Sequence, residues 1–259
     1  MTSEFMEGKS VALVGPASYV EHAGIETHVR NVDIVVRPNV KLWPTLDGLM
    51  LPKRTTSRCD VVYHSGSMVN ETVIGPKAGK DEIISERAGL SPTALRMYAA
   101  HGVKRVILAV TQPNILKIRL RSQNFANLSR MFAGSQLNIT FDYVRHLRRD
   151  QIFFSTGMRA LLHIVRQRPR SLMLFGFDFY SDQAGKAFPG YYDAIPGVPM
   201  PLLGTSSMHH PSIAMRSLSN VMNTHSNVYI DSHLANVLWD TNKVRVSAAQ
   251  TIHINKTAR

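Results

Sequence analysis

The sequence predicts an α/β fold of the Rossmann-like type, with a mostly parallel, twisted sheet flanked by helices. Two observations predict it. Short apolar, β-branched runs alternate with amphipathic stretches of helical spacing along most of the 259 residues, which is typical of parallel strands joined by helical crossovers. Small and polar residues also follow the predicted strands or open the predicted helices, at the carboxyl edge where such sheets bind ligands.

Four strands and one helix are predicted in the first 111 residues. The run SVALVGPAS at 10–18 is a buried strand that enters a Gly-Pro turn. The segment 91–102 has helix punctuation, because a Ser-Pro pair opens it and a Gly closes it. The other strands are predicted at 32–39, 59–67 and 103–111.

The second half of the chain continues this alternation. Helices are predicted at 122–135, 154–165 and 211–225, and strands at 137–144, 171–180 and 227–232. A loop rich in Gly and Pro runs from residue 182 to about residue 204. Such long loops in compact folds are commonly functional, so the sequence predicts a Gly/Pro-rich lid loop there.

We expect one domain over residues 1–259, because 44% hydrophobic residues suffice for one sizeable core. Its parts are a ligand-binding core at 9–180, a lid or acceptor loop at 181–210, and a C-terminal helix, strand and tail at 211–259. The single cysteine, Cys59, excludes an intrachain disulfide. No apolar run approaches the ~20 residues of a membrane span, and the start lacks the apolar region of a secretory signal.

The protein is strongly basic, with 30 Lys and Arg against 18 Asp and Glu and a net charge of +12. A basic surface favours anionic partners: nucleic acid, an anionic membrane or a phosphorylated small molecule. The clusters at 116–121, 145–150 and 166–170 are, taken singly, better explained as solvated helix faces. The single cysteine and the missing secretory signal and membrane span predict a cytoplasmic protein, and the basic charge leaves peripheral contact with an anionic membrane surface as an open alternative. The sequence does not indicate an oligomeric state.

The stretch FSTGM at 154–158 places Ser155, Thr156 and Gly157 at the start of a predicted helix. Small hydroxyl residues there cap the helix, and the same helix terminus attracts anions. The turn Gly15-Pro16 permits close backbone approach to a ligand, or is a plain tight turn. It has neither the three spaced glycines of a dinucleotide fingerprint nor the pattern of a phosphate-binding P-loop.

Acid–base candidates are concentrated around the predicted lid. His209 and His210 follow it, and a histidine there titrates near neutrality and can serve as a general base. Tyrosine hydroxyls can donate to a departing phosphate, and the candidates are Tyr180, Tyr191 and Tyr192. Packing of these side chains is the alternative. Asp178 lacks a close carboxylate partner and the His pair lacks metal-ligand spacing, so no metal site is expected.

Taken in order, these pieces resemble the sialyltransferases, over roughly residues 10 to 230. VALVGPAS with VDIVVRPN resembles the first long motif of the animal-type enzymes, and RTTSRCDVVYHSGS resembles the segment that follows it. FSTGM matches their short motif, and GYYD resembles their third motif with Gly190 in place of a histidine. The chain resembles the bacterial CMP-sialic-acid-dependent sialyltransferases equally well. Those enzymes have a Thr-Ser-Gly at a helix start, a strand ending Gly-Ile-Asp-Phe-Tyr and a histidine before a helix.

The resemblance implies an inverting, metal-independent glycosyltransferase without a cofactor, whose core at 9–180 binds a nucleotide sugar. His209, ahead of His210, would deprotonate the acceptor hydroxyl, and Tyr180 would assist the departing phosphate. Lys186 would replace a second tyrosine of the bacterial enzymes. Tyr191 and Tyr192 of the predicted lid are further candidates for contact with the leaving group or the acceptor. Residues implied in binding the donor, a sialic acid or Kdo-like sugar on CMP, are Gly15, Pro16, Asn39, Ser65, Gly66, Ser155, Thr156, Gly157 and Asp178.

The departures from the family leave the donor sugar, the acceptor and the activity itself open. The chain lacks the disulfide of the animal enzymes, their membrane anchor, and the acid that follows their motif histidine. The acceptor would be a glycan, a lipid or another anionic molecule, and the high positive charge admits nucleic acid. A non-catalytic basic domain that binds nucleotide or RNA is the alternative from another class of protein.

Overall fold

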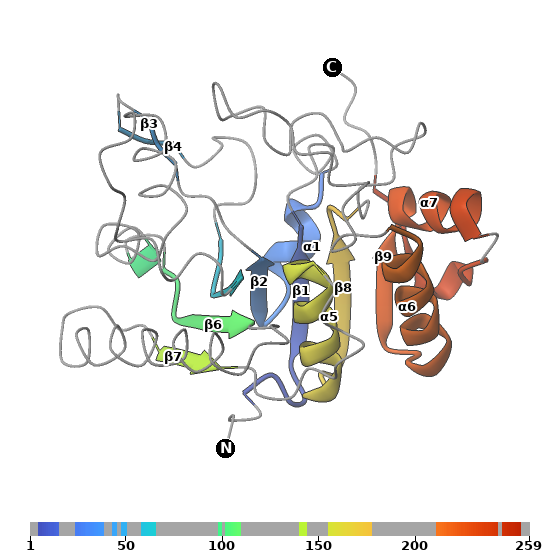
Figure 1. The fold of residues 1–259 in the computed structure, drawn as a ribbon, viewed down its shortest axis with the longest axis horizontal. Helices are drawn as coiled ribbons and strands as arrows, with labels where there is room; N and C mark the ends of the chain where they lie inside the picture. The colour runs from blue at the N-terminus through green and yellow to red at the C-terminus, as the bar shows by residue number, and fades with distance from the viewer. Residues whose placement is uncertain are drawn as a thin grey trace. The chain divides into compact units, whose positions relative to one another are not determined.

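The structure is a computed structural model of the chain (Figure 1). It describes residues 5–15, 24–38, 43–45, 48–50, 58–65, 98–99, 102–109, 140–143, 155–177, 211–242 and 245–254. The chain divides into two compact units. Residues 39–152 form most of the first, and residues 3–38 together with 153–259 form the second.

The first unit contains three parallel strands and a hairpin. Strand β6 pairs with β5 on one side and β7 on the other, both in parallel. Strands β3 and β4 pair antiparallel. The elements are β3 (Trp43–Thr45), β4 (Gly48–Met50), β5 (Val61–Ser65), β6 (Arg105–Ala109) and β7 (Thr140–Tyr143).

The described residues of the second unit form five parallel strands in the order β10-β9-β8-β1-β2. Helix α5 packs against β2, while α6 and α7 pack against β9 (Figure 1). The elements are β1 (Ser10–Val14), α1 (Glu26–Arg30), β2 (Ile34–Pro38), α5 (Thr156–Arg166), β8 (Ser171–Phe175), α6 (Pro211–Thr224), β9 (Val228–Asp231), α7 (Ser232–Asn242), η5 (Ala248–Gln250) and β10 (Thr251–Ile252).

The predicted α/β class is confirmed. In the second unit helices alternate with parallel strands along the chain, and in the first unit β5, β6 and β7 are parallel. Every residue of β1 is buried, as expected for an apolar strand covered on both faces. Strand β8 ends at Phe175, so the predicted strand at 171–180 is too long. The physical reason is Gly176, whose φ of +73° is incompatible with an extended strand. The predicted helix at 122–135 and the predicted lid lie outside the described residues.

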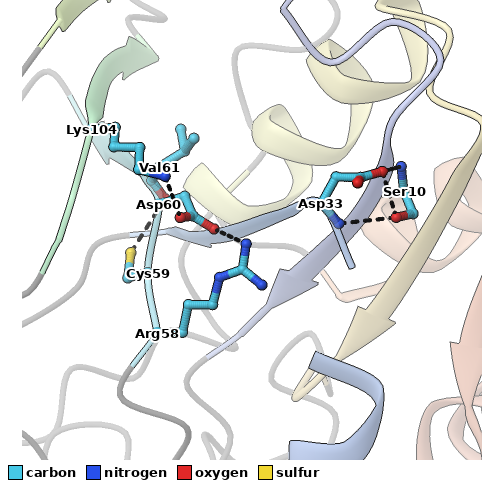
Figure 2. A network of polar contacts seen from close by, with 7 residues as sticks. All are labelled: Ser10, Asp33, Arg58, Cys59, Asp60, Val61 and Lys104. Atoms are coloured by element: carbon cyan, nitrogen blue, oxygen red, sulfur yellow. Dashed lines mark hydrogen bonds and ion pairs between the residues drawn. The ribbon is translucent and has the colours of Figure 1, made fainter. Parts of the chain in front are cut away.

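Polar contacts fix the amino ends of strands in each unit (Figure 2). In the first unit, Asp60 precedes β5 and pairs with Arg58 at 3.0 Å and with Lys104 at 3.6 Å. In the second unit, the carboxylate of Asp33 accepts hydrogen bonds from the backbone N–H and the hydroxyl of Ser10, both at 2.8 Å. Asp33 thereby joins the start of β1 to the start of β2.

The Ser10–Asp33 contact predicts an acid-sensitive contribution to stability. The hydrogen bond from the backbone N–H of Ser10, then that from its hydroxyl, lowers the pKa of Asp33 below its ordinary value. Because the folded pKa lies below the unfolded one, the stabilisation is present above the unfolded pKa and is lost as pH falls through the folded pKa. Asp33→Asn should therefore destabilise the protein at pH 7, with a deficit that shrinks below about pH 4.

Urea unfolding of the wild-type protein and of Asp33→Asn between pH 7 and pH 2.5 measures the difference in their free energies of unfolding. Asp240→Asn, which removes an exposed carboxylate of α7, is the matched control and should show no such convergence. A deficit for Asp33→Asn that stays constant down to pH 2.5 would show that the carboxylate charge does not contribute.

Candidate nucleotide site at the carboxyl edge of the second unit

The second unit has a topological switch point between β1 and β8. From β1 the chain first moves to β2 on one side, and it later returns to β8 on the other side of β1. In open α/β sheets, ligands bind in the crevice outside the carboxyl ends of the strands that flank such a point. The residues that leave these two strands are Gly15 and Gly176, so they mark the candidate site.

The two strand ends approach each other more closely than side chains would permit. The N–H of Gly15 donates to the carbonyl oxygen of Phe175 at 2.7 Å. A Cβ atom at Gly15 would overlap the carbonyl oxygen of Gly176 and lie 3.2 Å from Cδ1 of Phe177. Gly15 is therefore required by packing against Gly176 and Phe177 at this edge.

Helix α5 begins at this same edge. Its first turn is buried at Thr156 and Gly157, and a Cβ at Gly157 would lie only 2.5 Å from Cε1 of Phe177. Because Phe177 lies two residues after the end of β8, this contact places the start of α5 beside the carboxyl end of β8. The helix runs back from there towards the amino edge of the sheet.

Ser155 caps α5, as its position in the sequence predicts. Its φ and ψ of −58° and 160° are non-helical, and its hydroxyl accepts a hydrogen bond from the N–H of Met158 at 3.3 Å. Capping uses one of the N–H groups of the first turn, and the remaining ones still direct the positive end of the helix dipole outward. The cap and an anion-binding function are thus compatible at this helix.

Arg159 adds a positive charge to the first turn of α5, and it was not among the residues predicted from the sequence. No acidic residue lies in that turn. Burial of the guanidinium lowers the pKa of Arg159 to about 10, so the side chain stays cationic at neutral pH. A cation there opposes the helix dipole, whereas an anion is favoured by both. The signal in the sequence was the Arg that follows STGM, an unusual residue for a helix start.

Helix α6 also begins on the carboxyl side of the sheet. It leads into β9 through a short turn and packs against that strand, so it runs antiparallel to it. Its 14 residues span about 21 Å, which carries its first residue, Pro211, towards the carboxyl edge. The chain immediately before Pro211 contains His209 and His210.

The structure brings some of the predicted site residues together and leaves the others untested. Gly15 and Gly157 both contact the segment after β8, with Ser155 and Thr156 at the start of the same helix. Ser65 ends β5 in the first unit. The predicted residues outside the described part of the chain are Pro16, Asn39, Gly66, Asp178, Tyr180, Lys186, Tyr191, Tyr192, His209 and His210.

The described residues contain neither a membrane-spanning helix nor a metal-binding cluster. None of the described helices is long and apolar enough to cross a membrane. Within the same part of the chain, no three His, Cys, Asp or Glu side chains lie close enough together to hold a metal ion.

Comparison with known proteins finds likeness at the level of structure. No family model and no curated protein matches the chain. The solved structures that resemble it include the sialyltransferase CstII from Campylobacter jejuni in complex with a substrate analogue, cytidine-5'-monophosphate. The identity is 12% and the TM-score 0.45, with 97% of this chain and 91% of CstII covered.

Two structures of mammalian sialyltransferase also resemble the chain. One is in complex with Gal-beta-1-3GalNAc-ortho-nitrophenol, with 11% identity, a TM-score of 0.43, and 86% of this chain and 69% of that chain covered. The other has 11% identity, a TM-score of 0.46, and coverage of 88% and 71%. The resemblance noted in the sequence thus recurs among solved structures.

Proposed function

We propose that the protein is an inverting glycosyltransferase that transfers an acidic sugar from a CMP-activated donor to a hydroxyl group. The observation that carries the proposal is the switch point between β1 and β8, with the start of α5 beside the carboxyl end of β8. Open α/β sheets bind their ligands outside the strand ends at such a point. The helix terminus and Arg159 favour its phosphate or the carboxylate of its sugar.

The reaction is a single displacement. The acceptor hydroxyl loses its proton to the imidazole of His209 or His210, and its oxygen bonds to the anomeric carbon of the sugar. The bond from that carbon to the phosphate oxygen breaks, and CMP leaves with the bonding pair. Tyr180, with Lys186 or the Tyr191–Tyr192 pair, donates to the phosphate as it departs. The residues proposed to bind the donor are those that the sequence resemblance implies. The displacement requires no metal ion.

The first test is ligand-induced stabilisation. CMP should raise the melting temperature more than UMP, GMP or AMP, since a ligand present at 100 times its Kd stabilises the folded state by about 2.7 kcal/mol. CMP-sialic acid and CMP-Kdo, assayed for CMP release with a panel of glycan and lipid acceptors, then distinguish the donor sugars. If no nucleotide raises the melting temperature, the protein is not a CMP-dependent glycosyltransferase.

A histidine variant tests the base. His209→Ala should lower turnover about 10²–10⁴-fold while leaving CMP-induced stabilisation unchanged, because the base acts on the acceptor. His210→Ala is the matched control and should lose much less activity. If both variants retain full turnover, the base lies elsewhere.

A second candidate rests on the net charge of +12. A basic domain that binds nucleotide or RNA without turnover would be stabilised by CMP yet release none from CMP-sugars. A transferase with a nucleic-acid acceptor would show turnover together with DNA or RNA binding that weakens steeply with salt.

Cell fractionation tests the proposed cytoplasmic location and any association with anionic membranes.

A further inference from the structure

Asp231 joins three elements of the second unit through one buried carboxylate. It is the last residue of β9 and is fully buried. Its Oδ1 accepts a hydrogen bond from the N–H of Leu234 at 2.8 Å, which caps α7. Its Oδ2 accepts one from the N–H of Gly176 at 3.2 Å. The second bond is unnecessary for capping and reaches a residue 55 positions away in the sequence.

The second bond lies at the start of a contact path to the candidate site. Gly176 has a φ of +73°, and its carbonyl oxygen abuts Gly15. The next residue, Phe177, is buried, and its ring occupies the space beside Gly157 in the first turn of α5. A change in the orientation of the Gly176 peptide therefore moves both the crevice wall and the start of α5.

We propose that Asp231 is a positioning residue for donor binding, which acts through Gly176 and Phe177. Its carboxylate fixes the Gly176 peptide, that peptide orients the Phe177 ring, and the ring holds the first turn of α5 beside the crevice. The donor itself does not touch Asp231, since the side chain is fully buried. The identity of the ligand in this inference rests on the proposed function. The path from Asp231 to the start of α5 rests on the contacts alone.

Asp231→Asn separates positioning from capping. Asparagine caps helices about as well as aspartate, so α7 keeps its cap. Its amide offers only one acceptor oxygen, so the N–H of Gly176 then faces an NH₂ donor instead of an acceptor. A buried donor left without its acceptor forces the local backbone to shift. Asp231→Ser, which also caps but is too short to span both partners, is the second variant should the first fail to fold.

Gln250→Ala is the matched control, because it breaks a polar link at the other end of β9. The Nε2 atom of Gln250 lies 3.1–3.3 Å from the carbonyl oxygens of Met222, His225 and Val228. Removing it should destabilise the same unit without touching the carboxyl edge. CMP binding is then measured by calorimetry at a temperature where all variants are folded.

We expect Asp231→Asn to weaken CMP binding at least tenfold and Gln250→Ala less than twofold. Phe177→Leu should weaken CMP binding as well, and the double variant Asp231→Asn/Phe177→Leu should be no weaker than the worse single variant, because both changes act on one path. Equal effects of Asp231→Asn and Gln250→Ala, or additive effects in the double variant, would overturn the inference.

Amide hydrogen exchange distinguishes failure of this inference from failure of the proposed function. If the wild-type protein does not bind CMP, the proposed function is wrong, but the contact path is still measurable. Asp231→Asn should then speed exchange at Gly176 and in the first turn of α5 at least tenfold, and Gln250→Ala should not. Unchanged exchange at those amides would refute the path whatever the ligand.

Discussion

Gly15→Ala is expected to destabilise the protein by about 3 kcal/mol or more and to abolish stabilisation by CMP. The added Cβ would overlap the carbonyl oxygen of Gly176 and crowd Phe177. A backbone carbonyl at the end of a paired strand cannot rotate aside as a flexible side chain does, so β1 and β8 must separate at their carboxyl ends. Thermal unfolding should show a drop of about 6–12 °C.

Gly8→Ala is the control for Gly15→Ala. A Cβ at Gly8 would meet nothing within 4 Å, and only its φ of +67° opposes an alanine there. The cost of that backbone conformation is about 1–2 kcal/mol, with no effect on CMP binding. If Gly15→Ala costs no more than Gly8→Ala, the close approach of the two strand ends does not exist in solution.

Gly157→Ala is expected to lower the stability of the protein, although helix propensity alone predicts that alanine raises it. In an exposed helix interior the change would stabilise by about 1 kcal/mol. Here the methyl group would lie 2.5 Å from Cε1 and 3.3 Å from Cζ of Phe177. We expect a net loss of about 1–3 kcal/mol and at least a tenfold weaker affinity for CMP, measured by urea unfolding and by calorimetry.

The double variant Gly157→Ala/Phe177→Leu tests the cause of that loss. Leucine is smaller than phenylalanine and leaves room for the methyl group, so the double variant should be more stable than the sum of the two single changes predicts. A stabilising Gly157→Ala would mean that Phe177 does not pack against α5.

The fold class was predictable from the sequence because the strands are continuous apolar runs. Strand β1, with every residue buried, corresponds to SVALV, and the amphipathic stretch after FSTGM forms α5. Helix α1 was missed because five residues are too few to show a helical period. Helix α7 was not predicted although Asp231-Ser232 is a capping signal, because the same pair is also typical of the polar end of a strand.

The candidate site was only partly predictable. The cap at Ser155 is a local feature, and a local pattern therefore revealed it. The packing of Phe177 against Gly157 and the bond from Gly176 to Asp231 join residues distant in the sequence. No periodicity or spacing encodes such contacts, so the pattern could suggest a nucleotide at Gly15 without revealing what fixes the strand end beside it.

The discontinuous second unit has a consequence for how the protein is made. Met6 bonds to Gln167, 161 residues further along the chain, and the register of β1 with β8 begins at Ser10 and Ser171. At about 5–20 residues per second, the ribosome needs roughly 8–32 s to deliver the partner of β1 after β1 itself emerges. During that interval a strand that is wholly buried in the folded protein has one edge unpaired, which makes the nascent chain a natural client for chaperones and favours expression at low temperature.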